Sequence, residues 1–278
     1  MGANLAVKYS SKLDQLFTAG SYTDRYVNKK YDFTGAKTVE VYTATTVDPS
    51  NYDRTSTGDR FGGNAELHDT ITAYTIGNDK SFKIAIDRGN YEQGALAKKA
   101  GEVMKAEMEE KVIPMIDANR ILKAAIGAAA ASQYYAPTPS KAYEDVLKCS
   151  AALDEAKAPI SGRVLWVTPN FYNAIKAEIV TTVEANGYND KLLGRGFVGE
   201  LDGVAVVKVP SSYFPANTSA VMVHRDALLG VDQIKTTRII TDSEFVDGSI
   251  LVGRFVFDSF ILNGKKNAVA AIGTGSLS

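Results

Sequence analysis

The sequence from Lys37 to Val47 reads KTVEVYTATTV, and the sequence from Leu67 to Ile76 reads LHDTITAYTI. Both stretches alternate β-branched or aromatic residues with other residue types, which is the two-residue period of a β-strand. The intervening residues Asn51 to Glu66 are rich in Gly, Thr, Asp and Arg and contain almost nothing to bury. We therefore predict a long polar hairpin, which is marginally stable until another surface covers it. Such a hairpin suits a subunit that reaches over its neighbours.

A third strand pattern follows the hairpin, with the sequence KSFKIAIDR from Lys80 to Arg88. The preceding residues Gly77-Asn78-Asp79 are typical of a tight turn, so we expect them to join the second and third strands. The alternation predicts that Phe82, Ile84 and Ile86 lie on one face of this strand, with the intervening side chains on the other.

One long helix is predicted over residues 91–131, because the spacing of apolar residues changes after Asn90 to three and four. Lys105 and Glu109 are one of several opposite-charge pairs spaced four residues apart on its exposed side. Pro114 lacks a backbone N–H, so we expect a kink there. The alanine-rich end, residues 124–131, allows another backbone to approach closely. A helix of this length exceeds the width of one small domain, so we expect it to act as a spine under several elements.

The rest of the chain combines helix and strand patterns. An apolar stripe from Ala142 to Leu153 predicts one helix, and Thr168 followed by Pro169 predicts the start of another. Five strands are predicted, at Arg163–Val167, Val204–Val209, Ala220–His224, Ile250–Leu262 and Lys265–Ile272. The sequence of the fourth, ILVGRFVFDSFIL, is the strongest strand pattern in the chain.

Residues 1–36 are polar, weakly periodic and rich in tyrosine. A poorly ordered terminus is one interpretation of such a segment. The spacing of its aromatic residues favours an arm that becomes ordered on a partner's surface. We therefore expect Tyr22, Tyr26 and Tyr31 to contact another subunit.

Composition excludes several classes of protein. The 278 residues carry a net charge of -1, so no global basic field indicates a protein that wraps nucleic acid. The single cysteine, Cys149, permits neither an internal disulfide nor a thiolate metal cluster. The first 30 residues lack the apolar core of a secretory signal, and no apolar run is long enough to span a bilayer. We expect a non-exported protein without a membrane segment.

The motifs of enzyme chemistry are weak or absent. The sequence GRGFVG from Gly194 to Gly199 matches a dinucleotide-binding pattern, but a strand should precede it and a helix should follow. Here the order is inverted, so a flexible glycine-rich loop is the better interpretation. His68 and His224 are expected to be structural, and Cys149 lies on an apolar helical stripe, where it packs as a small thiol. We therefore predict no catalytic, cofactor or metal site.

Two short basic pairs, Lys29-Lys30 and Lys265-Lys266, remain. They could make sequence-independent contacts with nucleic-acid phosphates. As isolated pairs in the sequence, an ordinary solvated surface is the alternative.

Several local sequences resemble the major capsid protein of tailed bacteriophages, which has the fold named after phage HK97. These are YDFTGAKTVEVY, IDRGNYEQG, GELDGVAVVKVPSSYFP and FDSFILNGKKNA, within a resemblance that covers nearly the whole chain. It implies an α+β fold of five parts. They are an N-terminal arm (1–36), an extended hairpin loop or E-loop (37–90), a spine helix of the peripheral domain (91–131), an axial domain (132–235) and the C-terminal peripheral strands (236–278).

The resemblance also implies a function without catalysis. Pentamers and hexamers would assemble into an icosahedral shell around double-stranded DNA, contacted without sequence specificity, in a virion formed in the host cytoplasm. At the tip of the extended loop, Tyr52, Arg54, Arg60 and Phe61 are expected to contact a neighbour, with an ordinary mobile loop as the alternative. The chain begins directly with its arm, so a separate scaffolding protein is expected, with a portal and decoration proteins as further partners. An encapsulin shell is the alternative function, and a nucleotide-dependent enzyme using residues 194–199 is a remote one.

Overall fold

The computed structural model describes residues 20–31, 37–44, 46–62, 66, 69–87, 100–179, 197–240, 248–275 and 277. Contacts between residues divide the chain into two compact units. The smaller unit is Phe33–Thr75, and the larger combines Met1–Asp32 with Ile76–Ser278.

The smaller unit contains the predicted hairpin. Its strands β1 (Thr38–Ala44) and β2 (Asp69–Thr75) pair antiparallel, with Tyr42 opposite Ile71. Where the pairing begins, the hydroxyl groups of Thr38 and Thr75 lie 2.8 Å apart and form a hydrogen bond. The β-branched residues that predicted the two strands thus pair with one another, which confirms the two-stranded interpretation.

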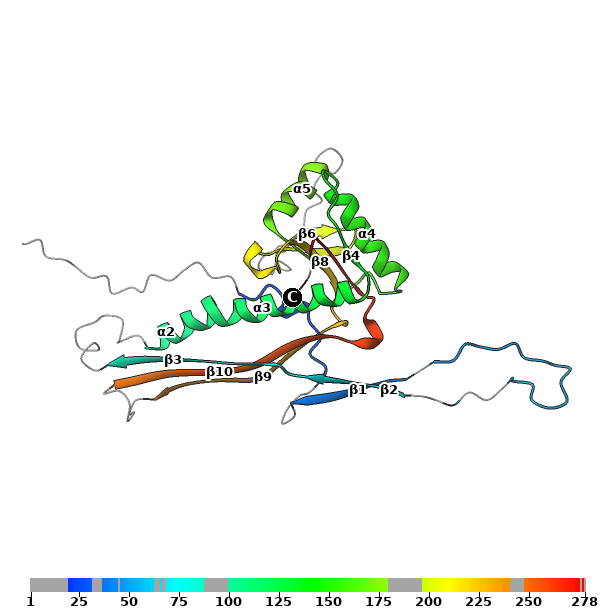
Figure 1. The fold of residues 1–278 in the computed structure, drawn as a ribbon, viewed down its shortest axis with the longest axis horizontal. Helices are drawn as coiled ribbons and strands as arrows, with labels where there is room; N and C mark the ends of the chain where they lie inside the picture. The colour runs from blue at the N-terminus through cyan, green and yellow to red at the C-terminus, as the bar shows by residue number, and fades with distance from the viewer. Residues whose placement is uncertain are drawn as a thin grey trace, which may run out of the picture. The chain divides into compact units, whose positions relative to one another are not determined.

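Six strands of the described larger unit form one mixed sheet (Figure 1). In their order across the sheet they are β4 (Tyr134–Tyr135), β11 (Val269–Gly273), β8 (Thr218–His224), β5 (Arg163–Val167), β7 (Val204–Lys208) and β6 (Phe197–Leu201). The central strand β5 is buried along its whole length, which explains its uninterrupted apolar sequence.

Helices cover both faces of this sheet. On one face, Leu165 and Val167 pack with apolar residues of α4 (Ala142–Glu155) and α5 (Pro169–Ile179). On the other face, Val164 and Trp166 pack with Ile121 and with three alanines of the long helix, Ala124, Ala125 and Ala128. These alanines are fully buried, which confirms the predicted close approach at the alanine-rich end.

A second sheet of three described strands has the order β3 (Asn78–Asp87), β10 (Gly248–Ile261) and β9 (Leu228–Ile240). Phe82, Phe255 and Phe257 of this sheet pack against Val112 and Ile116 of the long helix. Half-buried and exposed residues alternate along β3 from Phe82, as predicted.

The long helix consists of α2 (Ala100–Glu107), a π-helical segment η3 (Met108–Val112) and α3 (Ile113–Ala130). The π-helical segment ends at Val112, two residues before Pro114, where the sequence predicted a kink. The helix contacts β10 in one sheet and β11 in the other, so it is the expected spine (Figure 1). The predicted residues 91–99 lie outside the described residues.

Three predictions about strand arrangement are wrong. The strand β3 pairs with β10 and not with β2, so residues 77–79 form no hairpin turn and the compact loop unit ends at Thr75. The Gly77 N–H donates instead to Asp258 Oδ2 at 2.8 Å. The boundary predicted between residues 235 and 236 lies inside β9, a strand that the sequence analysis missed. The strand β11 was predicted among the C-terminal peripheral strands, but it pairs with β8 in the six-stranded sheet.

The glycine-rich stretch is also corrected. Its first three residues lie outside the described residues, but Phe197–Leu201 is the strand β6, paired antiparallel with β7. Gly199 has φ +143 beside an irregularity in the pairing, so the glycine serves a bulged strand. The context is that of a sheet edge, without the helix that a dinucleotide site requires.

Candidate assembly surfaces

The tip of the smaller unit is a closed loop that local bonds hold together. The rings of Tyr52 and Phe61 meet edge to face, with centroids 5.0 Å apart. The Asp53 N–H donates to the Arg60 carbonyl at 3.0 Å, and the Ser50 hydroxyl donates to the Phe61 carbonyl at 2.8 Å. The two ends of the loop are therefore joined directly beneath the aromatic pair.

Two short polar turns complete this tip. Asp53 accepts hydrogen bonds from the hydroxyl (2.6 Å) and the N–H (2.8 Å) of Thr55, which lower the pKa of its carboxyl. Asp59 accepts from the Phe61 N–H at 3.0 Å. Side-chain to backbone bonds of this kind shape a loop without burial. The expectation that the segment has no core holds, but the tip has a defined local conformation.

The four residues predicted at the tip are all exposed. Phe61 is 80% exposed and Tyr52 is 50% exposed, although they contact each other. Arg60 donates from Nε to the Ser56 carbonyl at 3.1 Å, and Arg54 lies in the same loop. Aromatic and arginine side chains are the residue types most enriched at protein interfaces. The structure thus brings together one exposed group with the composition of an interface anchor.

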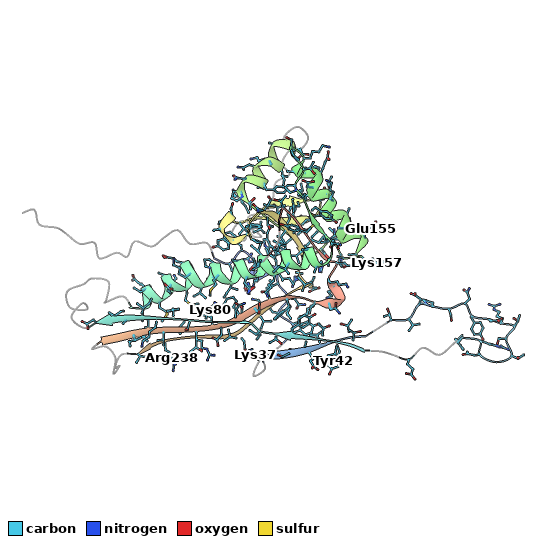
Figure 2. All side chains as sticks on the ribbon, viewed as in Figure 1. Lys37, Tyr42, Lys80, Glu155, Lys157 and Arg238 are labelled. Atoms are coloured by element: carbon cyan, nitrogen blue, oxygen red, sulfur yellow. The ribbon has the colours of Figure 1, made fainter. Side chains whose placement is uncertain are left out.

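A second apolar group on the hairpin was missed by the sequence analysis. Tyr42 and Ile71 lie opposite each other on β1 and β2 and are 63% and 53% exposed. Figure 2 shows the side chain of Tyr42 on its strand. The signal was present, because register places these two apolar residues on one face of the predicted hairpin. This exposed cross-strand pair is therefore a second candidate for contact with another chain.

The described part of the predicted arm lies on its own subunit. Tyr22 meets Tyr213 edge to face, with centroids 5.7 Å apart, and Tyr26 packs against the same core cluster. The backbone of Asn28 accepts from Gly230 N at 3.0 Å and donates to the Leu228 carbonyl at 2.8 Å. Tyr31 remains 38% exposed. Tyr22 and Tyr26 are therefore partly buried within the subunit, and their contact with a neighbour stays a prediction.

A buried ionic cluster holds this segment on the long helix. Asp117, which is 1% exposed, accepts from the hydroxyls of Ser21 (2.7 Å) and Thr23 (2.6 Å) and from the Tyr22 N–H (2.8 Å). One turn further along the helix, Arg120 is equally buried and donates to Thr23 Oγ1 at 3.1 Å. A buried carboxylate requires such partners, because removing it from water is costly.

Two more carboxylates surround Arg120. Its Nη1 donates to Asp24 at 3.3 Å and its Nη2 donates to Asp232 at 3.2 Å. Burial opposes ionisation of Asp24, but the hydrogen bond from Lys29 and the charge of Arg120 outweigh it and hold its pKa below the ordinary value. The cluster thus joins the N-terminal segment, the long helix and β9. Sequence analysis missed it.

The described histidine makes structural hydrogen bonds. His224 is buried, with Nε2 3.1 Å from the Ser161 carbonyl and Nδ1 accepting from the Asp226 N–H at 3.2 Å. His68 lies outside the described residues. Within the part of the chain that the structure describes, no acidic, histidine or cysteine residues form a group that could hold a metal ion. No helix in that part is long and apolar enough to cross a bilayer.

Cys149 is fully buried among apolar residues of α4 and the six-stranded sheet, as its helical stripe predicted. Burial, together with the charge of Asp145, raises the pKa of Cys149 from the model-compound value of 9.0 to about 12. A thiol of this kind is poorly reactive while the chain is folded.

This shift predicts that the folded chain loses stability as the pH rises above about 9, because the unfolded thiol ionises there and the folded thiol does not. We expect a loss of about 1.4 kcal/mol between about pH 8 and about pH 10, on top of other titrations. Urea unfolding of the wild type and of Cys149→Ala at both pH values measures it. The same pH dependence in both proteins contradicts the prediction.

Together, these features define a structural subunit. A long helix supports two sheets, and a separate hairpin unit exposes aromatic side chains that suit contact with other chains. A comparison with known families matches residues 69–271 to the family described as phage capsid protein. The chain belongs to the phage capsid protein family. A comparison with curated protein sequences gave no match.

Solved structures show the same fold. A structure from Mycobacterium phage Che8 is 16% identical, with a TM-score of 0.66, and the match covers 98% of each chain. A capsid structure of cyanophage P-SCSP1u is 15% identical, with a TM-score of 0.71 over 99% of this chain and 94% of that one. The mature capsid of bacteriophage PhiM1 is 12% identical, with a TM-score of 0.70 over 98% and 94%.

These comparisons confirm the resemblance and the α+β capsid fold that the sequence indicated. The protein is a phage capsid protein, a component of the virion shell. The family is structural, so the expectation that the chain is not an enzyme is confirmed. The alternatives of an encapsulin and of a nucleotide-dependent enzyme are not supported.

Proposed function

We propose that copies of this chain assemble through pentamers and hexamers into a closed shell that encloses double-stranded DNA. The observation that carries the proposal is the separate unit Phe33–Thr75, in which Tyr42, Phe61 and Ile71 are more than half exposed in a chain of the capsid family. Each Å² of their apolar surface that a neighbour removes from water stabilises the assembly by about 25 cal/mol. Closed symmetry then repeats the same contact many times.

Each part of the fold takes a role in this proposal. The unit Phe33–Thr75 is the extended loop that lies across an adjacent subunit. The six-stranded sheet with α4 and α5 is the axial domain, whose copies meet at the centres of pentamers and hexamers. The long helix with the three-stranded sheet is the peripheral domain, and residues 20–31 are the described part of the arm.

Tyr52, Arg54, Arg60 and Phe61 make the contact of the loop tip in this assignment. Their exposure supports it, because exposed aromatic and arginine side chains are the types most enriched at protein interfaces. Tyr31 is the arm residue most available to a neighbour, while Tyr22 and Tyr26 first fix the arm on its own subunit. The remaining partners are a separate scaffolding protein, a portal, decoration proteins and the packaged DNA, within a virion assembled in the host cytoplasm.

Electron microscopy of the purified chain tests the proposal. We expect pentameric and hexameric capsomers, with closed shells of uniform diameter once a scaffolding protein is present. Small uniform shells formed by the chain alone, without scaffold or DNA, would favour an encapsulin-type compartment. A chain that stays monomeric under all assembly conditions would contradict the proposed function.

A further inference from the structure

The two basic pairs that are far apart in the sequence converge on one residue in the fold. Lys30 Nζ lies 3.5 Å from the Asp226 carboxylate, and Lys265 Nζ lies 3.4 Å from the Asp226 carbonyl. The pairs Lys29-Lys30 and Lys265-Lys266 therefore belong to one region of the surface. Separated by more than 200 positions, they could not be recognised as one group from the sequence.

Next to this point is a cavity of about 430 Å³. Among the described residues that line it, the charged ones are Lys157, Lys265, Lys266 and the carboxylate of Asp226. The ammonium group of Lys30 contacts the same carboxylate from outside the lining. Glu155, the last residue of α4, stands near Lys157 but does not line the cavity (Figure 2). Positive charge is therefore in excess here, although the whole chain has a net charge of -1.

The backbone at Lys157 adds an independent observation. After α4, the N–H of Lys157 donates to the Asp154 carbonyl at 2.8 Å and that of Ala158 donates to the Leu153 carbonyl at 3.0 Å. This is the hydrogen-bond pattern of a Schellman C-cap, in which Lys157 occupies the left-handed position with φ 56. Glycine is the residue that this position favours. The chain instead has a lysine here, at the wall of a cavity with two further lysines.

We propose that Lys30, Lys157, Lys265 and Lys266, named here the lysine cluster, bind the phosphate backbone of nucleic acid. This inference rests on the proposed function, in which the shell encloses double-stranded DNA, and names the surface that contacts it. The four side chains are exposed, with Lys30 at 73%, so a phosphate can reach them without desolvating the fold. Ammonium groups on flexible stems act as point charges that read no sequence.

Charge density favours nucleic acid over an acidic protein segment as the partner. A duplex carries one phosphate charge for about each 1.7 Å of its axis and releases condensed counterions when lysines neutralise it. Three ammonium groups that line one cavity, with that of Lys30 beside them, can then contact several phosphates at once. Each contact contributes about 0.9 to the slope of log affinity against log salt.

A matched pair of variants tests the lysine cluster. The first combines Lys157→Gly, Lys265→Gln and Lys266→Gln, where glycine suits the left-handed backbone and so protects the fold. The control combines Lys80→Gln, Lys105→Gln and Lys141→Gln, which removes the same charge from exposed lysines elsewhere (Lys80 in Figure 2). Fluorescence anisotropy with a labelled random-sequence duplex of about 30 base pairs measures binding at several salt concentrations.

For the cluster variant we expect duplex affinity at least about tenfold lower at 0.1 M salt and a salt slope smaller by about two to three. The control keeps affinity within about threefold. Equal losses in the two variants overturn the inference, and so does a wild-type chain that does not bind the duplex. Binding of poly-glutamate of equal total charge as tightly as the duplex overturns the assignment to nucleic acid.

Imaging separates this inference from the proposed function. Closed shells formed by the cluster variant, together with weaker duplex binding, support both. Closed shells with unchanged duplex binding overturn the lysine cluster and leave shell assembly intact. If the wild type forms no shells, the proposed function fails, while the anisotropy of unassembled subunits still decides whether the lysine cluster binds nucleic acid.

Discussion

Replacing Asp117 with alanine lowers the free energy of unfolding of the unassembled subunit by about 3–5 kcal/mol. The side chain is 1% exposed and accepts three hydrogen bonds from the N-terminal segment. Without it, the hydroxyls of Ser21 and Thr23 and the Tyr22 N–H lose their acceptor. Arg120, 2% exposed and 3.8 Å from Asp117, keeps its charge in the interior with one fewer carboxylate.

The loss should also release the N-terminal segment, because this cluster is its polar attachment to the long helix. Urea unfolding measures the stability, and hydrogen exchange of residues 20–31 measures the release. The matched control is Glu144→Ala, which breaks the exposed pair that Lys141 and Glu144 form at 2.9 Å and should cost no more than about 1 kcal/mol. A loss below about 1 kcal/mol for Asp117→Ala, or unchanged exchange in the segment, contradicts the prediction.

Replacing Phe61 with aspartate should impair shell assembly and leave the stability of the subunit nearly unchanged. We expect the yield of closed shells to fall by at least about tenfold, while the free energy of unfolding changes by less than about 0.5 kcal/mol. Phe61 is 80% exposed and belongs to no core cluster, so the isolated subunit gains little from it. If a neighbour covers its ring, truncation of such an aromatic anchor commonly costs 2 kcal/mol or more for each interface, about a thirtyfold change in affinity.

Thr57→Asp is the control for Phe61→Asp, because it adds the same charge to the same exposed loop and leaves both rings in place. Sedimentation and electron microscopy of the assembly mixture measure the shell yield, and urea unfolding measures the stability. The control should assemble within about threefold of wild type. Normal shells from Phe61→Asp would show that the loop tip is an ordinary solvated surface.

The two variants together separate folding from assembly. Asp117 acts inside the subunit, where burial makes an unpaired group costly. Phe61 lies on the surface of the subunit, where we propose that another copy buries it. If Asp117→Ala abolished shells through misfolding, its low stability would reveal this, and Phe61→Asp would still report on the interface.

The local pattern of apolar residues in the sequence was sufficient to predict most of the helices and strands. The apolar sequence RVLWV predicted β5, and ILVGRFVFDSFIL predicted β10 within two residues at each end. The strand β9 was missed because Gly230 and Asp232 interrupt its apolar residues. Pairing with β10 supplies the extended conformation that its own sequence does not indicate.

The sequence carried a signal for the loop tip and for the Tyr42–Ile71 pair, but not for the Asp117 cluster or the lysine cluster. Tyr52 and Phe61 stand out as aromatic residues in a polar stretch, and a loop of that length lets them meet. The contact between Thr23 and Asp117 joins positions 94 residues apart and has no local pattern. The convergence of the lysine pairs on Asp226 is likewise a property of the folded chain.

The amino-acid sequence alone determined the long helix and the polar hairpin, because hydrophobic period and turn composition are properties of consecutive residues. It also indicated the class of protein, through local sequences that resemble a known family. Only the tertiary structure decided that β3 pairs with β10, that the N-terminal segment is fixed by Asp117 and Arg120, and that four lysines share one surface. All three features depend on which distant segments of the chain pack against each other. The free energy of burying apolar surface determines that packing for the whole chain together.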